Sequence, residues 1–205
     1  LKEYDKSISR HEALKKMKDK AFTTSYYLGI SYFGKKDYWE AHDNLLAAYK
    51  KRPFDINVLY HLAKASVKGS WKEDGLEYIK EAIEITTPSD SVMARLYEVL
   101  VECEQNVRKN SPYERIENIK KLYGLNKDYS LFYNIGYIYE KETKDEPNAL
   151  HYYKKYMDAV TKNDNLLVDS DGNPKDGAYS HETYKQSRII AFFKKMKEKE
   201  FFEKG

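Results

Sequence analysis

The stretch of the sequence with the most obvious chemistry is DSDGNPKDG, in which acidic and amide side chains alternate as the ligands of a calcium loop do. Asp169, Asp171 and Asn173 hold the alternating places. Such a loop also needs glycine at its sixth position, to turn the chain, and glutamate at its twelfth, to chelate the ion. Those positions hold Pro174 and Ser180. The stretch therefore favours a mobile turn, with calcium binding as the alternative.

The longer segment 163–180 is rich in Asp, Asn and Gly, and its length is unusual for a simple connection. We predict that it is an inserted loop with a role of its own. The apolar residues 166–168 would dock it against the body of the protein.

Catalytic and cofactor chemistry finds little support. The five histidines are scattered, without an HExxH pair, and the sequence has no glycine-rich nucleophile turn or phosphate-cradling loop. The single cysteine, Cys103, follows Leu96 and Leu100 at helical spacing, which is typical of a core position, and it has no partner for an intrachain disulfide. We predict a protein that is not an enzyme and that binds no metal and no cofactor.

Aromatic side chains are the stronger candidates for a functional surface. The chain contains 20 tyrosines, and the helix predicted around residues 26–33 carries two apolar stripes. One stripe includes Gly29, and the other consists of Tyr26, Ile30 and Phe33 at positions i, i+4 and i+7. Tyrosine suits recognition because it combines a rigid apolar ring with a hydroxyl group.

The composition predicts helices as the elements that position these side chains. Among 205 residues there are only five prolines and nine glycines, while 34% of the residues are charged and 41% are hydrophobic. This balance suits amphipathic helices with solvated outer faces. The chain is long enough for one domain or one short repeat array.

Charge and hydropathy argue against several kinds of partner. Lys and Arg number 36 against 33 Asp and Glu, and the two signs are interspersed. The basic and aromatic stretch 188–202 is interrupted by glutamates, so we predict no nucleic-acid partner. The longest apolar run near the C-terminus, 189–193, is too short to cross a bilayer.

The compartment stays open from the sequence. The chain begins with Leu1 and shows no apolar signal segment, so we expect a mature or trimmed product. We expect a soluble protein, either cytoplasmic or, if a signal segment has been removed, periplasmic or secreted.

Residues 26–53 predict a helical hairpin. A first helix ends at the GKKD turn, where Gly34 serves as the terminal glycine and Asp37 caps the next helix. The second helix spans about 38–51 and is stopped by Pro53. The small residues Gly29 and Ala41 allow the two antiparallel helices to approach closely. The inward residues of the second helix are Ala41, Leu45 and Ala48.

A hairpin of this kind cannot bury both faces, and the sequence repeats it. Adding 34 carries Leu28, Gly29, Ala41, Leu45 and Ala48 to Leu62, Ala63, Gly75, Ile79 and Ala82. Adding 107 carries Leu28, Gly29 and Tyr32 to Ile135, Gly136 and Tyr139, and one more residue aligns Ala41 with Ala149.

This spacing of small residues resembles the tetratricopeptide repeat (TPR) family over about residues 22–160. Pro53 and Pro88 add to the resemblance. It implies an all-α fold, a right-handed α-solenoid of about four hairpins at 22–55, 56–89, 90–128 and 129–162. Two units depart from the pattern. In the third unit, Tyr97 stands at the position of Gly29, and Ile116 or Arg115 stands at the position of Ala41. In the fourth unit, Tyr156 stands at the position of Ala48.

The flanks are predicted to cap the array, with helices at 1–21 and 181–205 on either side of the loop 163–180. Ile189, Phe192, Phe193 and Met196 form one apolar side of the C-terminal helix. Phe201 and Phe202 are surplus to a simple cap, so this helix could instead serve self-association.

The resemblance further implies a concave groove, lined by the first helix of each hairpin, that receives a peptide or a partner helix. The predicted binding residues are Tyr26, Ile30, Phe33, Tyr60, Lys64, Val67, Arg95, Tyr133 and Tyr137. The carboxylate clamp known in the family is not present, because Tyr26 and Ile30 occupy two of its places and Arg95 alone does not rebuild it.

We therefore predict a protein-interaction scaffold or adaptor that binds a protein or peptide ligand through aromatic contacts. Two alternatives remain open. The tyrosines could pack against the neighbouring repeat, or they could stack on sugar rings in a glycan receptor whose pocket is closed by residues 163–180.

Overall fold

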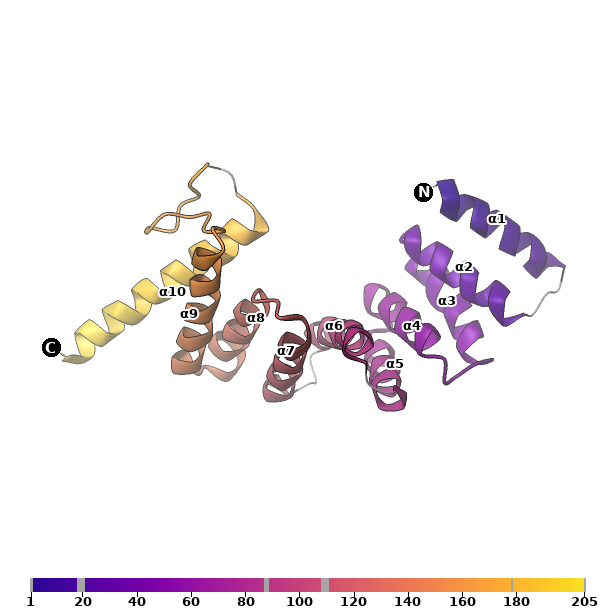
Figure 1. The fold of residues 1–205 in the computed structure, drawn as a ribbon, viewed down its shortest axis with the longest axis horizontal. Coiled ribbons are helices and arrows are strands. Elements are labelled where there is room, and N and C mark those ends of the chain that lie inside the picture. Colours follow the sequence, from indigo (N-terminus) through magenta and orange to yellow (C-terminus); the bar gives the residue numbers. More distant parts are fainter. Residues whose placement is uncertain (1, 18–20, 87–88, 108–110, 178, 205) are drawn as a thin grey trace. The chain divides into compact units, whose positions relative to one another are not determined.

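The computed structural model describes residues 2–17, 21–86, 89–107, 111–177 and 179–204. Throughout these ranges the regular elements are helices, and a bridge between Val168 and Pro174 is isolated (Figure 1). The chain forms two compact units, residues 1–126 and 127–205, called unit 1 and unit 2 below. No helix in the described ranges combines the length and the apolar character that a bilayer crossing requires.

Unit 1 is a succession of antiparallel helices in which each packs on the next. The helix α4 also packs against α2 and α6, so the first helices of three successive hairpins are neighbours. The helices are α1 (Lys2–Lys16), α2 (Phe22–Gly34), α3 (Tyr38–Tyr49), α4 (Ile56–Lys68), α5 (Lys72–Ile85), α6 (Asp90–Asn106) and α7 (Pro112–Asn126).

Unit 2 contains one hairpin and the C-terminal helix. Its elements are α8 (Leu131–Ile138), the π-helical turn η1 (Tyr139–Thr143) that continues α8, α9 (Glu146–Lys162) and α10 (His181–Lys204). The boundaries predicted for the four repeat units stay predictions. Pro88 lies outside the described residues, as do the side chains of Phe201 and Phe202.

The close approach at Gly29 is confirmed, but its partner is Leu45. A Cβ atom added to Gly29 would lie 2.5 Å from Leu45 Cγ, and one added to Gly136 would lie 2.6 Å from the ring of Tyr153. Glycine at these positions therefore makes room for a large side chain of the second helix. In the hairpin of α4 and α5 the glycine lies on the second helix instead of the first. A Cβ atom added to Gly75 of α5 would lie 3.0 Å from the Cβ atom of Ser66 on α4.

The prediction that the first helix ends at Gly34 is confirmed. Gly34 is the last residue of α2, and the left-handed conformation falls on Lys36, with φ of 66°. A Cβ atom on Gly34 would lie 2.4 Å from the ring of Tyr4, so this glycine makes room for α1. The predicted cap is present, since the Asp37 side chain accepts a hydrogen bond from the backbone N–H of Glu40 at 3.2 Å. The helix after it ends at Tyr49, before the predicted residue.

The loop 163–180 is held on α10 by a buried glutamine. The Gln186 side chain accepts a hydrogen bond from the Leu167 N–H at 2.8 Å and donates one to the Asn165 carbonyl at 2.9 Å. Val168 is buried, as the docking prediction required, whereas Leu167 is partly exposed. The Asp169 carboxylate accepts hydrogen bonds from the backbone N–H groups of Asp171 and Asn173, and no set of residues suited to a metal ion occurs in the described part of the chain. A hydrogen-bonded turn thus accounts for the alternating acidic residues.

Substituting Gly29 with alanine should destabilise unit 1 by about 1–3 kcal/mol, because the new methyl group must displace Leu45. Chemical denaturation monitored by circular dichroism measures this change. Gly124→Ala is the matched control. It lies inside α7 with no atom within 4 Å of its added Cβ, so it should stabilise the protein by about 0.5–1 kcal/mol. Equal effects of the two substitutions would contradict the packing role of Gly29.

Candidate functional site

The best candidate for a binding surface in unit 1 lies where α2, α4 and α6 are neighbours. Tyr26, Ile30 and Phe33 on α2 are each half-buried, as are Tyr60 and Lys64 on α4, and Arg95 on α6 is exposed. The Lys64 ammonium lies 5.4 Å from the centre of the Phe33 ring, which joins the predicted stripes of two helices. We call these six residues the α2/α4/α6 face.

Tyr60 is the centre of this face because two cations lie against its ring. The Arg95 guanidinium is 4.8 Å from the ring centre, and the Lys64 ammonium is 5.2 Å from it. Both distances are within the range of a cation–π interaction. Within the described residues neither cation is part of a salt bridge, so each can pair with an acidic group of a ligand.

A pocket of about 190 Å³ opens beside these groups. Its lining combines the apolar side chains of Ile56, Val92 and Leu96 with Tyr60, Arg95 and Asn57, which carry polar groups. An apolar pocket with a few polar groups at its edge can hold one side chain of a ligand and orient it.

The positive charges of Lys64 and Arg95 also act on His61, a residue that was not predicted from the sequence to belong to the site. Its ring meets those of Tyr26, at 6.0 Å, and Tyr60, at 5.1 Å. Burial, and then the charges of Lys64 and Arg95, lower the pKa of His61 to about 4. The imidazole is therefore neutral at pH 7, and its Nδ1 atom has no hydrogen-bond partner among the described residues.

Two of the predicted binding residues do not offer an open surface. Val67 is only 4% exposed and belongs to the core formed with α5 and α6. Tyr133 is 8% exposed in unit 2. Tyr137 is 41% exposed, but the Arg188 guanidinium lies 4.8 Å from its ring centre. We leave Val67 and Tyr133 out of the proposed surface.

The helix α10 covers the predicted groove positions of unit 2 with a charged network. Arg188 forms a salt bridge with Glu140 and donates hydrogen bonds to the hydroxyl groups of Tyr153, at 2.8 Å, and Tyr133, at 3.4 Å. Tyr153 donates a hydrogen bond to Glu140 at 2.8 Å. Burial would raise the pKa of Glu140, but hydrogen bonds from Lys141 and Tyr153 and the charge of Arg188 outweigh it, so this pKa is lowered.

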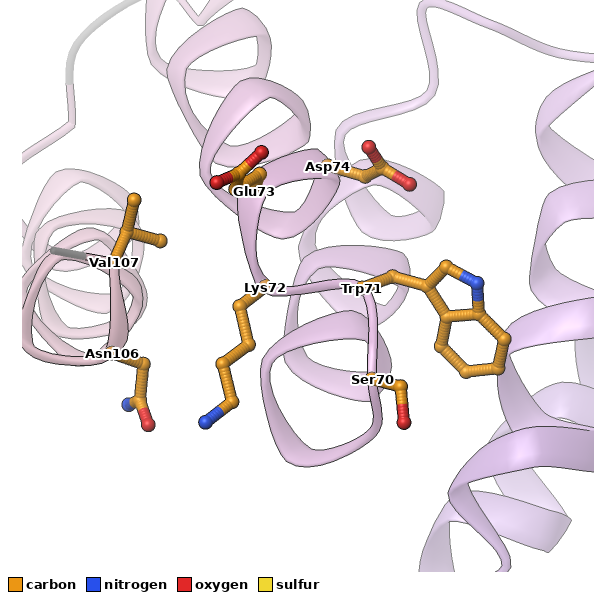
Figure 2. Close-up of a pocket in the computed structure, with 7 residues that line it drawn as sticks. All are labelled: Ser70, Trp71, Lys72, Glu73, Asp74, Asn106 and Val107. Atoms are coloured by element: carbon orange, nitrogen blue, oxygen red, sulfur yellow. The ribbon is translucent and has the colours of Figure 1, made fainter. Parts of the chain in front are cut away.

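A larger hollow of about 460 Å³ lies between the start of α5 and the end of α6 (Figure 2). Lys72 and Asn106 face each other across it, and the indole of Trp71 points to the other side of the turn. None of the residues predicted to bind a ligand lines it. The α2/α4/α6 face, which unites most of those residues, is therefore the stronger candidate.

The two tryptophans, Trp39 and Trp71, lie with their ring centres 4.8 Å apart, a contact that was not predicted from the sequence. Their separation of 32 residues is close to the repeat spacing and was the signal that could have paired them. Arg188 had no such signal, because it lies outside the repeating part of the sequence.

Comparison with known proteins identifies the fold. No protein-family model and no curated protein matches the chain. MamA from Desulfovibrio magneticus RS-1, at 16% identity, has a solved structure that covers 78% of this chain and 88% of its own, with a TM-score of 0.65. YrrB, described as a TPR protein with an unusual peptide-binding site, matches at 20% identity and a TM-score of 0.62 over 77% of this chain and 78% of its own.

A third similar structure is the APC/C hetero-tetramer Cut9–Hcn1, of which one chain matches at 14% identity with a TM-score of 0.62. The match covers 92% of this chain and 33% of that one. These likenesses confirm the predicted all-α fold of repeated helical hairpins.

The half-buried His61 predicts a pH dependence of stability. Its pKa is about 4 in the folded protein and about 6.5 when unfolded. Its contribution is thus fully present above pH 6.5 and is lost as the pH falls towards 4, by up to about 3 kcal/mol. The free energy of unfolding of the parent protein should therefore fall more steeply over this range than that of His61→Phe. His151→Phe, on the exposed surface of α9, should leave the pH dependence of the parent unchanged.

The Arg188 network predicts a strong coupling in unit 2. Arg188→Met should cost about 3 kcal/mol, because it leaves the half-buried Glu140 carboxylate with only the partly exposed Lys141 as a cation and removes the hydrogen bonds to Tyr153 and Tyr133. The double variant Arg188→Met, Glu140→Gln should recover part of that loss in a double-mutant cycle. Lys199→Met, which removes an exposed salt bridge to Glu146, should cost less than about 1 kcal/mol. A similar cost for Arg188→Met and Lys199→Met would show that α10 is held by other contacts.

Proposed function

Because this chain has the helical-repeat fold of the tetratricopeptide repeat family, we propose that it is a non-catalytic scaffold that binds a peptide or a partner helix on the α2/α4/α6 face. The observation that carries the proposal is the Tyr60 ring, which lies against Lys64 and Arg95 beside an apolar pocket. A repeat array presents such a face as a continuous surface, which suits an extended ligand better than a small molecule.

The chemistry of the face indicates what the ligand carries. Lys64 and Arg95, which form no salt bridge with any described residue, favour a carboxylate on the ligand, and the pocket favours an apolar or aromatic side chain next to it. The aromatic rings of Tyr26 and Phe33 would extend the contact along α2. Arginine and tyrosine are also the side chains most often found at the energetic centre of protein interfaces.

The glycan alternative receives less support. It relied on a pocket closed by the loop 163–180, and the hydrogen bonds of this loop instead tie it to Gln186 of α10. Clustered tyrosines remain compatible with sugar stacking, so the alternative is kept as an outcome of the experiment below.

Self-association through α10 stays a second proposal. Ile189 and Phe192 are buried within unit 2, so a second copy would have to use the exposed part of this helix. Sedimentation of the full chain and of a variant with Phe201 and Phe202 replaced by serine tests it. Identical monomeric behaviour of both proteins would refute it.

The α2/α4/α6 face can be tested with peptides selected from a random display library against the immobilised protein. The double variant Tyr60→Ala, Arg95→Ala should weaken binding of a selected peptide by about tenfold or more, because it removes the ring and one cation of the centre. Tyr113→Ala, which removes an exposed tyrosine of α7, is the matched control and should leave the affinity unchanged. Isothermal titration calorimetry provides the affinities.

Two results would contradict the proposal. One is unchanged peptide affinity in the Tyr60→Ala, Arg95→Ala variant with its circular dichroism spectrum intact. The other is failure to select any peptide together with saturable binding to a glycan array that the same variant abolishes, which would establish the glycan alternative.

A further inference from the structure

A second surface of unit 1, formed by α3 and the start of α5, carries both tryptophans of the chain. Trp39 lies in the first turn of α3 and Trp71 immediately before α5. We propose that Trp39 and Asp43 on this surface bind an arginine side chain of a partner protein. This site is separate from the α2/α4/α6 face and does not depend on the function proposed for that face.

Trp71 is fixed in place by its neighbours. Its ring stacks on that of His42 at a centroid distance of 3.9 Å, with only 5° between the planes. It also lies over Gly69, where an added Cβ atom would come within 3.0 Å of the indole. Trp39 therefore packs against a ring whose position is fixed by its other contacts.

Trp39 is the ring that this arrangement leaves open. It contacts Trp71 at a centroid distance of 4.8 Å with a tilt of 48°, yet 61% of it is exposed to solvent. The exposed face of this indole is therefore available for contact with a partner's side chain. Because its neighbour is rigid, Trp39 would lose little conformational freedom on binding.

A carboxylate, that of Asp43, lies next to Trp39 on this surface. Asp43 follows Trp39 by four residues on α3, which places the two side chains one turn apart on the same side of the helix. The Asp43 side chain is 61% exposed, and the Nδ1 atom of His42 lies 3.7 Å from its carboxylate. Burial lowers the pKa of His42, although Asp43 and Asp74 oppose the shift, so the imidazole is neutral at pH 7 and leaves the Asp43 charge in place.

A second carboxylate, that of Asp74 on α5, lies near Trp71. In Figure 2 the carboxylate of Asp74 lies on the same side of the turn as the indole of Trp71, whereas the Lys72 side chain extends to the opposite side, towards Asn106. Asp43 and Asp74 thus place carboxylates beside the tryptophans, and two lysines, Lys15 and Lys50, line the hollow that Asp43 shares with Glu40.

An exposed indole beside an exposed carboxylate fits an arginine side chain. The planar guanidinium can stack on the indole and at the same time donate hydrogen bonds to the carboxylate. Lysine can satisfy the charge but lacks the planar group, and a neutral apolar side chain would gain nothing from Asp43. The charge of the surface thus selects a basic segment, whereas the charge of the α2/α4/α6 face favours an acidic one.

The intrinsic fluorescence of the protein provides a direct test, because the only two tryptophans of the chain belong to this surface. The probes are a hexa-arginine peptide and a hexa-citrulline peptide, which has the same shape without the charge. At low ionic strength hexa-arginine should change the tryptophan emission in a saturable manner, and hexa-citrulline should not. Asp43→Asn should weaken hexa-arginine binding by about fivefold or more, and Trp39→Phe should reduce both the affinity and the spectral change.

The controls separate this site from others. Asp158→Asn removes an exposed carboxylate of α9 and should leave hexa-arginine binding unchanged. The Tyr60→Ala, Arg95→Ala variant should also bind hexa-arginine as the parent does, so failure of one proposal leaves the other standing. An equal response to hexa-citrulline, or an unchanged affinity in Asp43→Asn with intact circular dichroism, would overturn the inference.

Discussion

The packing of one large side chain into the space left by a glycine closes the first hairpin of unit 1 and the hairpin of unit 2. Leu45 fills this space at Gly29 and Tyr153 fills it at Gly136. A hairpin closed in this way buries only one side of each helix, so the next hairpin has to cover the other side. In unit 1 this requirement brings α2, α4 and α6 together and creates a face to which three helices contribute.

Much of this arrangement could be predicted from the sequence, because the spacing of small residues determines which side of each helix is buried. The spacing also placed Phe33 and Tyr60 on the same face as Lys64, as observed. Periodicity does not reveal what covers a helix face, however. Tyr133 has the same position in its repeat as Tyr26, but it is buried because α10 lies over it with Arg188, a residue outside the repeats. The role of Gly34 was missed for a similar reason, since the ring of Tyr4 comes from a flanking helix.

The tyrosines contribute to the structure in different ways. Some bridge helices by donating to a carboxylate, as Tyr49 does to Glu81 at 3.2 Å and Tyr153 to Glu140 at 2.8 Å. The ring of Tyr60 instead lies within reach of two cations and beside a pocket. Tyrosines such as Tyr49 and Tyr153 therefore have a structural role, in which the hydroxyl group donates to a carboxylate of another helix. Tyr60 has a candidate role in binding. A count of tyrosines could not make this distinction, because it contains no information about hydroxyl partners.

The burial of Cys103 gives the protein an internal chemical reporter. This thiol is the only one in the chain, it is fully enclosed in the core formed by α4, α5 and α6, and burial raises its pKa to about 12. In the closed protein it is therefore both inaccessible and protonated, which suppresses alkylation and oxidation. Any covalent labelling of the chain by a thiol reagent must await a transient separation of these helices, so the labelling rate records how often the centre of unit 1 opens.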